Sequence, residues 1–338
     1  MTALRAADRP GLPRRLLTFP ALTLHPFAAL PSLLAPGDLV VVNDAATLPA
    51  SLTGTVRGAP IELRLSGQRP DGAWEAVRFG AGDWHVDTDL RDPPPAVLPG
   101  DRLAFATLTA VVVAVPHPRR VVVRFDGPAD TFWPALYREG HPVQYRHLAA
   151  ALDVWDVQTP YAGPPWAVEP PSAGLALTVA LIGALRARDV DVVALTEAAG
   201  LSATGDTDLD AALPFPERYA VPAATWSAVE RTCARRHATG TGRVVAVGTS
   251  VVRALETVAR TGVLAGVTDL HLGADNPVRV VHGLVSGVHA PGSSHHALLD
   301  AVLVGNGLDR AGLTTLGERA ADLGLRDHEL GDGVLILG

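Results

Sequence analysis

The alternation of strand-like and helix-like segments after about Tyr145 is the feature that most constrains the fold of this chain. Short apolar runs rich in Val, residues 190–195 and 243–247, alternate with longer segments such as 174–188 and 222–237, whose apolar residues have helical spacing. Runs of about five apolar residues fit buried strands and are too short for buried helices. Alternating strands and helices favour a mostly parallel sheet that is covered by helices.

Residues from about 52 to 140 show a different pattern, with little helical periodicity before Phe132. Strand-like runs are separated here by turn-rich pieces, and these runs are residues 60–65, 73–79, 103–115 and 120–125. Several short strands with turn signals between them are typical of all-β architecture. The pattern therefore predicts a small antiparallel barrel or sandwich.

A further apolar run, residues 39–42, precedes this region and has no helix next to it. We expect it to join the later sheet, which makes the β-rich region an insertion. A chain of 338 residues is long enough for two domains. The expected fold class is α/β: a main domain of residues 1–51 and 146–338, with a mostly parallel sheet and flanking helices, carries an inserted small antiparallel β-barrel domain of residues 52–145.

Composition narrows the classes of function. Apolar residues make up 48% of the chain, enough for a buried core, and the single cysteine, Cys233, excludes an internal disulfide and a thiolate metal cluster. The formal net charge of −7 argues against a sequence-nonspecific nucleic-acid binder, which needs a cationic face. No apolar run is long enough to span a bilayer. We therefore expect a cytoplasmic protein with no membrane partner.

The strongest local signal is residues 243–256, where an apolar strand passes through Gly248, Thr249 and Ser250 into a helix. Such a turn leaves backbone N–H groups and the positive end of the helix dipole free to bind a phosphate or a carboxylate. A plainer interpretation makes Thr249 or Ser250 an ordinary helix N-cap.

The same segment carries a family resemblance. Residues 246–256 read AVGTSVVRALE, which resembles the A-V-G-T-T-S-V-R-x-L-E of the S-adenosylmethionine-dependent tRNA ribosyltransferase-isomerase family of queuosine synthesis. Arg253 and Glu256 are both retained. They lie one helical turn apart, so they either face a substrate, as the resemblance implies, or form a weak solvated pair on the surface.

Further segments resemble the family in the same order along the chain. They are residues 37–52 (GDLVVVNDAATLPASL), 158–162 (QTPYA), 171–175 (PSAGL), 280–293 (VVHGLVSGVHAPGS, with Pro291 and Ser293) and the pair Gly331 and Asp332, which matches the G-D of S-Y-G-D-A-M. Collinear matches of this kind are hard to obtain by chance. The resemblance therefore covers the chain from about Gly37 to Leu337.

The resemblance implies a specific reaction. Such enzymes use S-adenosylmethionine as a co-substrate and pass its ribosyl part to a 7-deazaguanine in a tRNA anticodon, where the sugar isomerises while adenine and methionine are released. No metal is involved. The implied partners are S-adenosylmethionine and, as a possible acceptor, tRNA.

This chemistry needs a base beside the sulfonium, hydrogen-bond donors for the departing adenine and carboxylates that face the sulfonium charge. The catalytic candidates that the resemblance implies are His289, Asp44, Glu217 and Asp332. The candidates for binding the donor are Asn43, Ser172, Gly174, Gly248, Thr249, Ser250, Arg253, Glu256 and Ser293.

His289 is the first candidate for general acid/base catalysis, because an imidazole near its free pKa can do either job; its alternative is a structural histidine. A metal site made of His282, His289, His295 and His296 would lack the usual cysteine or carboxylate ligands, so no metal is expected.

Several motif positions differ from the family pattern. Two arginines are replaced at Ala46 and Ser51, and three histidines at Ala176, Ala198 (in T-L-H-V-G-x-G-T-F) and Phe215; Gly287 and Leu330 replace an Asn and a Tyr. The lost groups are ones that a tRNA substrate would use. Two alternatives therefore stay open beside the family reaction: a paralogue that converts S-adenosylmethionine on a small-molecule pathway, and a non-catalytic nucleoside-binding protein.

Overall fold

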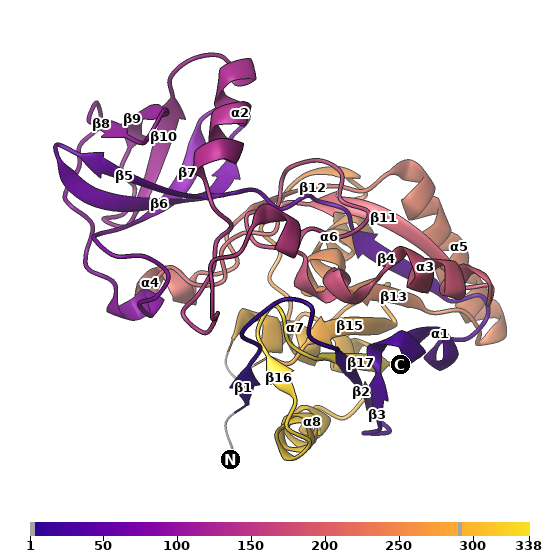
Figure 1. The fold of residues 1–338 in the computed structure, drawn as a ribbon. Coiled ribbons are helices and arrows are strands. Elements are labelled where there is room, and N and C mark those ends of the chain that lie inside the picture. The colour runs from indigo at the N-terminus through magenta and orange to yellow at the C-terminus, as the bar shows by residue number, and fades with distance from the viewer. Residues whose placement is uncertain (1–3, 290–292) are drawn as a thin grey trace.

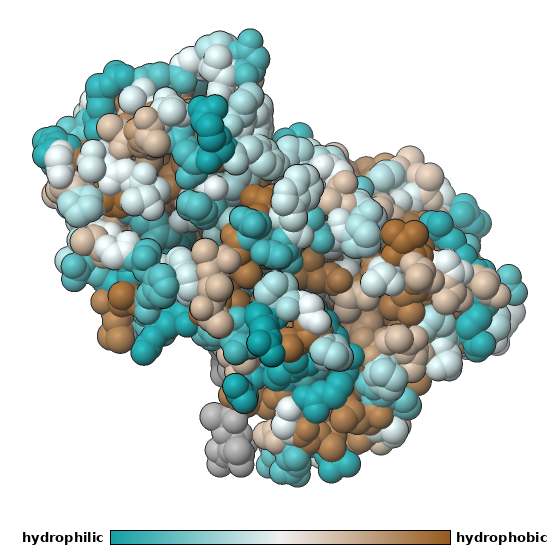
Figure 2. Space-filling view, in the orientation of Figure 1, coloured by the Kyte–Doolittle hydropathy of each residue, from teal (hydrophilic) through white to brown (hydrophobic). Residues whose placement is uncertain are grey.

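The computed structural model describes residues 4–289 and 293–338, so Pro291 of the matching segment lies outside the described residues. The chain forms two lobes, a small barrel coloured indigo to magenta and a larger sheet flanked by helices (Figure 1). On the face shown in Figure 2 the two lobes are in broad contact, with a recess below the barrel.

The smaller lobe is a closed antiparallel barrel with strand order β10-β7-β6-β5-β8-β9. Its strands are β5 (Ser51–Val56), β6 (Ala59–Gln68), β7 (Trp74–Phe79), β8 (Arg102–Ala104), β9 (Thr109–Ala114) and β10 (Arg120–Phe125). The predicted run 103–115 is thus a hairpin of two strands. Helix α2 (Ala129–Glu139) packs the buried side chains Phe132 and Leu136 onto the barrel core.

The larger lobe is built on a nine-stranded sheet with strand order β14-β12-β11-β4-β13-β15-β17-β2-β3. Its strands are β2 (Arg15–Phe19), β3 (Leu24–Pro26), β4 (Leu39–Asn43), β11 (Asp191–Glu197), β12 (Glu217–Ala220), β13 (Val244–Val247), β14 (Ala265–Thr268), β15 (Gly283–Gly287) and β17 (Gly333–Leu337). The four central strands, β11, β4, β13 and β15, are parallel, and most of the outer pairs are antiparallel. The α/β class with an antiparallel barrel is confirmed, and β4 joins the sheet as expected, but the sheet is mixed rather than mostly parallel, because its outer strands pair mainly antiparallel.

Helices complete the larger lobe: α1 (Leu30–Leu33), α3 (Val179–Arg186), α5 (Ala223–Thr239), α6 (Thr249–Thr261), α7 (Ser294–Gly305) and α8 (Ala311–Asp322), whereas α4 (Thr207–Ala211) lies beneath the barrel (Figure 1). Short 3-10 helices span Phe27–Ala29, Thr88–Leu90, Val154–Val157 and Ser172–Ala176, and β1 (Arg5–Ala6) pairs with β16 (Arg326–Asp327). The predicted helix 174–188 is divided, because Thr178 caps α3 by accepting from the Leu181 amide. In the described part of the chain, no helix is long and apolar enough to cross a membrane.

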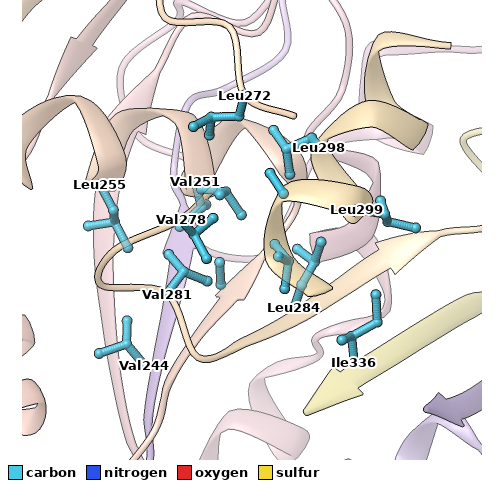
Figure 3. Packing of buried hydrophobic residues seen from close by; sticks show 14 of the residues in the cluster. Val244, Val251, Leu255, Leu272, Val278, Val281, Leu284, Leu298, Leu299 and Ile336 are labelled. Atoms are coloured by element: carbon cyan, nitrogen blue, oxygen red, sulfur yellow. The ribbon is translucent and has the colours of Figure 1, made fainter. Parts of the chain in front are cut away.

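Both faces of the sheet are covered, because successive residues of its buried strands point to opposite sides. In β4, Val41 packs with the core beneath α5, α6 and α7, whereas Val40 packs with the core beneath α1 and α3. Side chains from β13, α6, β15 and α7 converge in the first core (Figure 3). With both faces closed, the ends of the central strands are where a ligand can reach the sheet.

Candidate active site

A cavity opens at the carboxyl ends of the parallel strands. Strands β4, β11, β13 and β15 end at Asn43, Glu197, Val247 and Gly287. Segments that follow β11, β13 and β15 line the cavity together with residues 169–173, which come from the segment before α3. This edge is where open α/β sheets bind their ligands.

The turn at Gly248 gives the cavity its backbone donors. Gly248 has φ of +95°, a conformation that a residue with a side chain would adopt only under strain, and its amide donates to the Val285 carbonyl at 2.8 Å. Gly248 is itself the N-cap of α6, and no side chain caps the helix. Thr249 and Ser250 line the cavity, so the N-cap interpretation of these residues is wrong. The uncapped first turn of α6 can therefore donate to a ligand.

Three carboxylic side chains line the cavity: Glu169, Glu217 and Glu329. Burial alone would raise the pKa of Glu329, but the hydrogen bond and charge of His147 reverse this and lower it. Burial raises the pKa of Glu169, which Tyr145 and Ser202 oppose in part by hydrogen bonding. Among the described residues the cavity is thus lined by three acidic side chains and one arginine, Arg253, and Glu329, with its lowered pKa, is the carboxylate best suited to a cationic ligand.

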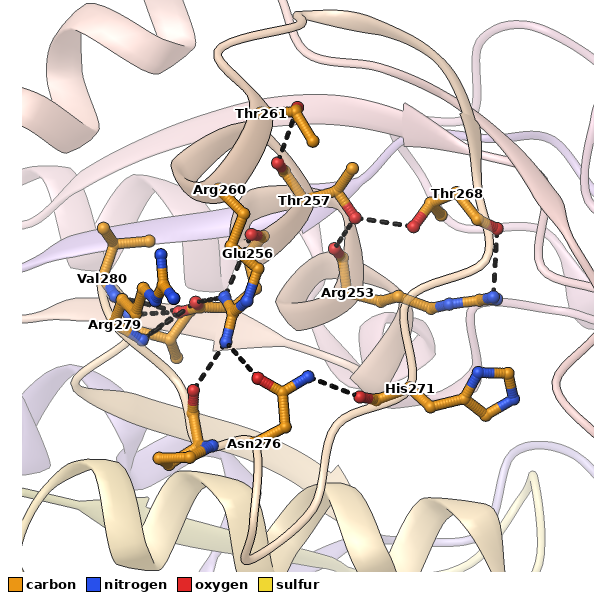
Figure 4. A network of polar contacts seen from close by, with 12 residues as sticks. Arg253, Glu256, Thr257, Arg260, Thr261, Thr268, His271, Asn276, Arg279 and Val280 are labelled. Atoms are coloured by element: carbon orange, nitrogen blue, oxygen red, sulfur yellow. Dashed lines mark hydrogen bonds and ion pairs between the residues drawn. The ribbon is translucent and has the colours of Figure 1, made fainter.

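Arg253 is held by several acceptors rather than by Glu256. Its guanidinium forms a buried ion pair with Glu217. It also donates to the carbonyl groups of Leu270 at 2.9 Å and Thr268 at 3.0 Å; the bond to Thr268 is drawn in Figure 4. Glu217 in turn accepts from the Gly200 amide at 2.6 Å. The ion pair of Arg253 and Glu217 is therefore held in one orientation at the side of the cavity.

Glu256 does not face the cavity, which corrects both interpretations of this residue. Its carboxylate is fully buried, accepts from the amides of Arg279, Val280 and Val281 at 2.8 to 3.2 Å, and forms an ion pair with Arg260 (Figure 4). These contacts attach α6 to the segment before β15. Glu256 is thus neither a donor-binding residue nor half of a surface pair.

His289 lines the cavity just after β15. Its Nε2 lies 2.9 Å from the Ser286 hydroxyl, and its ring stacks on His295 with centroids 4.7 Å apart. Burial, followed by repulsion from neighbouring histidines, lowers the pKa of His289 to about 3. The imidazole is therefore neutral near pH 7, the form that a general base requires, although the lowered pKa also weakens its basicity, and its acid/base role stays a prediction.

Of four other residues predicted to bind the donor, only one lines the cavity. Ser172 lines the cavity. Asn43 lies behind it, where its Nδ2 donates to the Glu197 carbonyl at 2.9 Å and to the Ser250 hydroxyl at 3.3 Å. Ser293 is the N-cap of α7. Gly174 is required by packing, since an added Cβ would lie 2.3 Å from the Tyr161 hydroxyl.

Asp44 and Asp332 are not among the residues that line this cavity. Asp44 accepts from the Thr196 hydroxyl at 2.6 Å, and burial raises its pKa. Burial would also raise the pKa of Asp332, but hydrogen bonds from Arg326 and Arg15 lower it to about 2. Asp332 borders only a smaller neighbouring cavity and is fully engaged by the two arginines, so its expected catalytic role is corrected to a structural one.

The sequence interpretation missed Glu197, the last residue of β11. Its side chain is completely buried, and among the described residues neither carboxyl oxygen has a hydrogen-bond partner. Burial and the neighbouring Glu217 raise the pKa of Glu197 well above its ordinary value. The available signal was an acidic residue in the position that is Leu in the motif T-L-H-V-G-x-G-T-F.

The described residues include one group that could approach a metal ion: His147, His328 and Glu329, with ligand atoms within 4.8 Å of one another. The two imidazoles stack nearly parallel, 4.1 Å apart at 19°, so their lone pairs do not converge on one ion. Instead, His147 pairs with Glu329 at 3.2 Å. His282 is not part of this group; its Nδ1 accepts from the Val244 amide at the opposite end of β15.

Fold and cavity together define an α/β protein with an inserted barrel and a ligand cavity, lined by acidic groups and helix amides, at the carboxyl edge of its sheet. A family model described as queuosine biosynthesis protein matches residues 9–336. The chain belongs to this family.

Individual relatives agree with the family match. The chain is 34% identical to an S-adenosylmethionine:tRNA ribosyltransferase-isomerase from Thermosynechococcus vestitus, over 98% of this chain and 92% of the relative. It is 36% identical to the protein of that name from Anaeromyxobacter dehalogenans, over 92% and 87%. The crystal structure of an S-adenosylmethionine tRNA ribosyltransferase from Thermotoga maritima has the same fold, with a TM-score of 0.50 and 23% identity over 100% of this chain and 98% of that one.

Proposed function

We propose that this protein is an S-adenosylmethionine-dependent tRNA ribosyltransferase-isomerase, which transfers and isomerises the ribosyl part of S-adenosylmethionine on a 7-deazaguanine acceptor and releases adenine and methionine. The observation that carries the proposal is the cavity at the carboxyl edge of the sheet, where carboxylic side chains face the uncapped first turn of α6. The relatives with this name, matched over nearly the whole chain, support it.

The charges of the cavity fit S-adenosylmethionine. This molecule carries a cationic sulfonium and an ammonium group, which suit the side chains of Glu169, Glu217 and Glu329. Its own carboxylate and its hydroxyl groups suit backbone amides and hydroxyl groups at a helix N-terminus, here Thr249 and Ser250. We assign the donor site to these residues together with Ser172, Gly248 and Arg253.

We assign the base to His289 from its position: its imidazole lines the cavity, the Ser286 hydroxyl orients its ring, and its lowered pKa keeps it in the unprotonated form that a base requires. Glu217, fixed by Arg253 and Gly200, presents a carboxyl group to the charge that develops on the substrate. The side chains that line the cavity supply this chemistry, and the proposal includes no metal ion.

The acceptor has a place of its own between the lobes. A second cavity is lined by barrel residues, including Arg69, and by Trp166 and Arg218 of the larger lobe; Glu217 borders both cavities. The Arg218 guanidinium stacks on the Trp166 ring at 3.7 Å, a combination that RNA-binding proteins use to hold unstacked bases. We therefore assign the donor to the α/β domain (1–51 and 146–338) and part of the acceptor site to the barrel domain (52–145).

Calorimetry and product analysis test the proposal. Titration with S-adenosylmethionine should show binding, and adenine and methionine should be released when tRNA carrying the 7-deazaguanine is added. Release without RNA would instead indicate a small-molecule pathway, and binding without release a non-catalytic protein. If S-adenosylmethionine does not bind the folded protein, the proposal is wrong.

A further inference from the structure

Glu197 is a buried acid that stands directly behind the donor cavity. Asn43 fixes its backbone from both sides: the Asn43 Oδ1 accepts from the Glu197 amide at 3.0 Å, and Nδ2 donates to its carbonyl at 2.9 Å. The side chain is completely buried, and within the described chain its two oxygens make no hydrogen bond. An ionised carboxylate in such a place is strongly disfavoured unless something compensates its charge.

The surrounding charges do not compensate it. The charged groups that face Glu197 are Glu217 from β12 and Arg253 from α6. Arg253 is already paired with Glu217, which also accepts from the Gly200 amide. Two carboxyl groups share one guanidinium, so the pair keeps one proton as a unit. Burial raises the pKa of both groups, but only Glu217 holds the contacts that stabilise a charge, so the proton resides on Glu197.

Ser250 connects this proton to the cavity. The Ser250 hydroxyl interacts with the Glu197 carboxyl group and opposes in part the rise of its pKa, and Ser250 also lines the cavity. Its Oγ accepts from the Asn43 Nδ2 at 3.3 Å, which leaves the hydroxyl hydrogen free for another acceptor. A hydroxyl group can accept from one side and donate to the other, so Glu197, Ser250 and a ligand can form a chain of hydrogen bonds.

We propose that Glu197 is the proton reservoir of this site and acts through Ser250 on the leaving group of the donor. The inference rests on the proposed function. As the bond between the sugar carbon and the adenine nitrogen breaks, its electron pair stays on adenine. Adenine takes the hydroxyl proton of Ser250, and Ser250 takes the proton of Glu197, whose O–H bond breaks. Adenine leaves neutral, and Glu197 remains as a carboxylate facing Arg253.

This assignment complements that of His289. The imidazole of His289 is neutral and can accept a proton, whereas Glu197 is protonated and can give one. Titratable groups whose surroundings push their pKa values apart in this way divide the acid and base roles of a site. Glu197 is a positioning residue, since it reaches the substrate only through Ser250.

The first test needs no substrate. Between the ordinary pKa of a glutamate, about 4.3, and the raised pKa of Glu197, the unfolded chain loses its proton and the native protein keeps it. The unfolding equilibrium of the wild type should therefore shift toward unfolding by about tenfold per pH unit relative to Glu197→Gln, measured in urea. Glu318→Gln, at an exposed site on α8, should follow the wild type. Parallel curves for wild type and Glu197→Gln would show that Glu197 holds no proton and overturn the proposal.

The second test is the pH profile of adenine release. Wild-type turnover should fall as pH rises through the pKa of Glu197. Glu197→Gln keeps the shape and polarity of the side chain. It should abolish the fall in turnover at high pH, reduce turnover by up to about 100-fold and leave the affinity for S-adenosylmethionine unchanged. Ser250→Ala should reproduce the slower turnover. Glu197→Leu separates packing from protonation, because a purely structural role predicts normal turnover for Gln and a defect only for Leu.

The outcomes separate the two proposals. If the wild type does not bind S-adenosylmethionine, the proposed function fails, and the urea experiment still decides whether Glu197 is protonated. If the wild type binds and releases adenine but Glu197→Gln has the same rate and pH profile, the relay through Ser250 is wrong and the proposed function stands.

Discussion

Glu256 and Glu197 are both completely buried in the larger lobe, yet their surroundings are opposite. Around Glu256, at the middle of α6, three backbone amides and Arg260 meet the carboxylate. Around Glu197, at the end of β11, the Ser250 hydroxyl interacts with the carboxyl group, but no backbone amide is bonded to it within the described chain, and the arginine that faces it, Arg253, already has a partner. Burial alone therefore does not distinguish a structural acid from a functional one. The two acids differ instead in the number of contacts that stabilise the charge of each carboxylate.

The comparison predicts different responses to substitution, which we rank by their effect on the free energy of unfolding. Glu256→Gln should have the largest effect, a loss of about 3–5 kcal/mol, because it leaves Arg260 without its buried partner. Urea unfolding at pH 7 measures this, with Glu318→Gln as the exposed control. A loss below about 1 kcal/mol would show that contacts around Glu256 contribute little, and the contrast with Glu197 would disappear.

Asp332→Asn should come next, since Asp332 also has a fully stabilised charge. Its pKa of about 2, against an ordinary value near 3.9, corresponds to about 2–3 kcal/mol at pH 7. A lowered pKa stabilises the protein above the ordinary value, and this contribution is lost as pH falls from about 4 through 2. Wild type and variant should thus converge in acid. A constant difference across this range would mean that the effect comes from packing.

Arg260→Met should have a smaller effect, about 1–2 kcal/mol, because the three amides still hold the Glu256 carboxylate. Its aliphatic side chain keeps the packing along α6. The loss is to be compared with that of Glu256→Gln in the same urea series. If the two variants lose equal stability, the ion pair and not the amides accounts for the contrast.

His289→Ala should have the smallest effect on stability, less than about 1 kcal/mol, because it removes one hydrogen bond at the edge of a cavity. Turnover should nevertheless fall at least about 100-fold, as expected for loss of a general base, while S-adenosylmethionine still binds. Unchanged kinetics would remove His289 from the mechanism. The contrast between Glu256, whose surroundings contribute to stability, and the cavity residues, which contribute to turnover, would then fail.

Local patterns predicted the elements whose signal lies within a few residues. The apolar run at 39–42 forms the central strand β4, and the strand-turn-helix at Gly248 has the expected form. Strand β12 was not predicted, because ERYA is short and mostly polar and is held by pairing with β11 and β14. Such pairing depends on tertiary contacts, which a local pattern does not contain.

The partners of buried charges were the hardest part of the site to predict. Helical spacing places Arg253 next to Glu256, but Arg253 pairs with Glu217, 36 positions away, and Glu256 binds amides 23 to 25 positions away. Glu197 departs from the Leu of its motif, but the sequence does not show that its side chain is buried beside Glu217 and Arg253 at the end of β11. Ser172 and Gly248, which line the cavity, could be predicted because both lie in short segments that resemble the family motifs.

Glu217 borders both the cavity at the sheet edge and the cavity between the lobes. Two ligands that meet at one carboxyl group cannot bind independently. A cation in the first cavity changes the charge that the second ligand encounters, and thermodynamic linkage requires the second to change the affinity of the first by the same factor. Glu217 therefore couples the two binding events, so that a ligand in one cavity changes the affinity of the other cavity before any bond is broken.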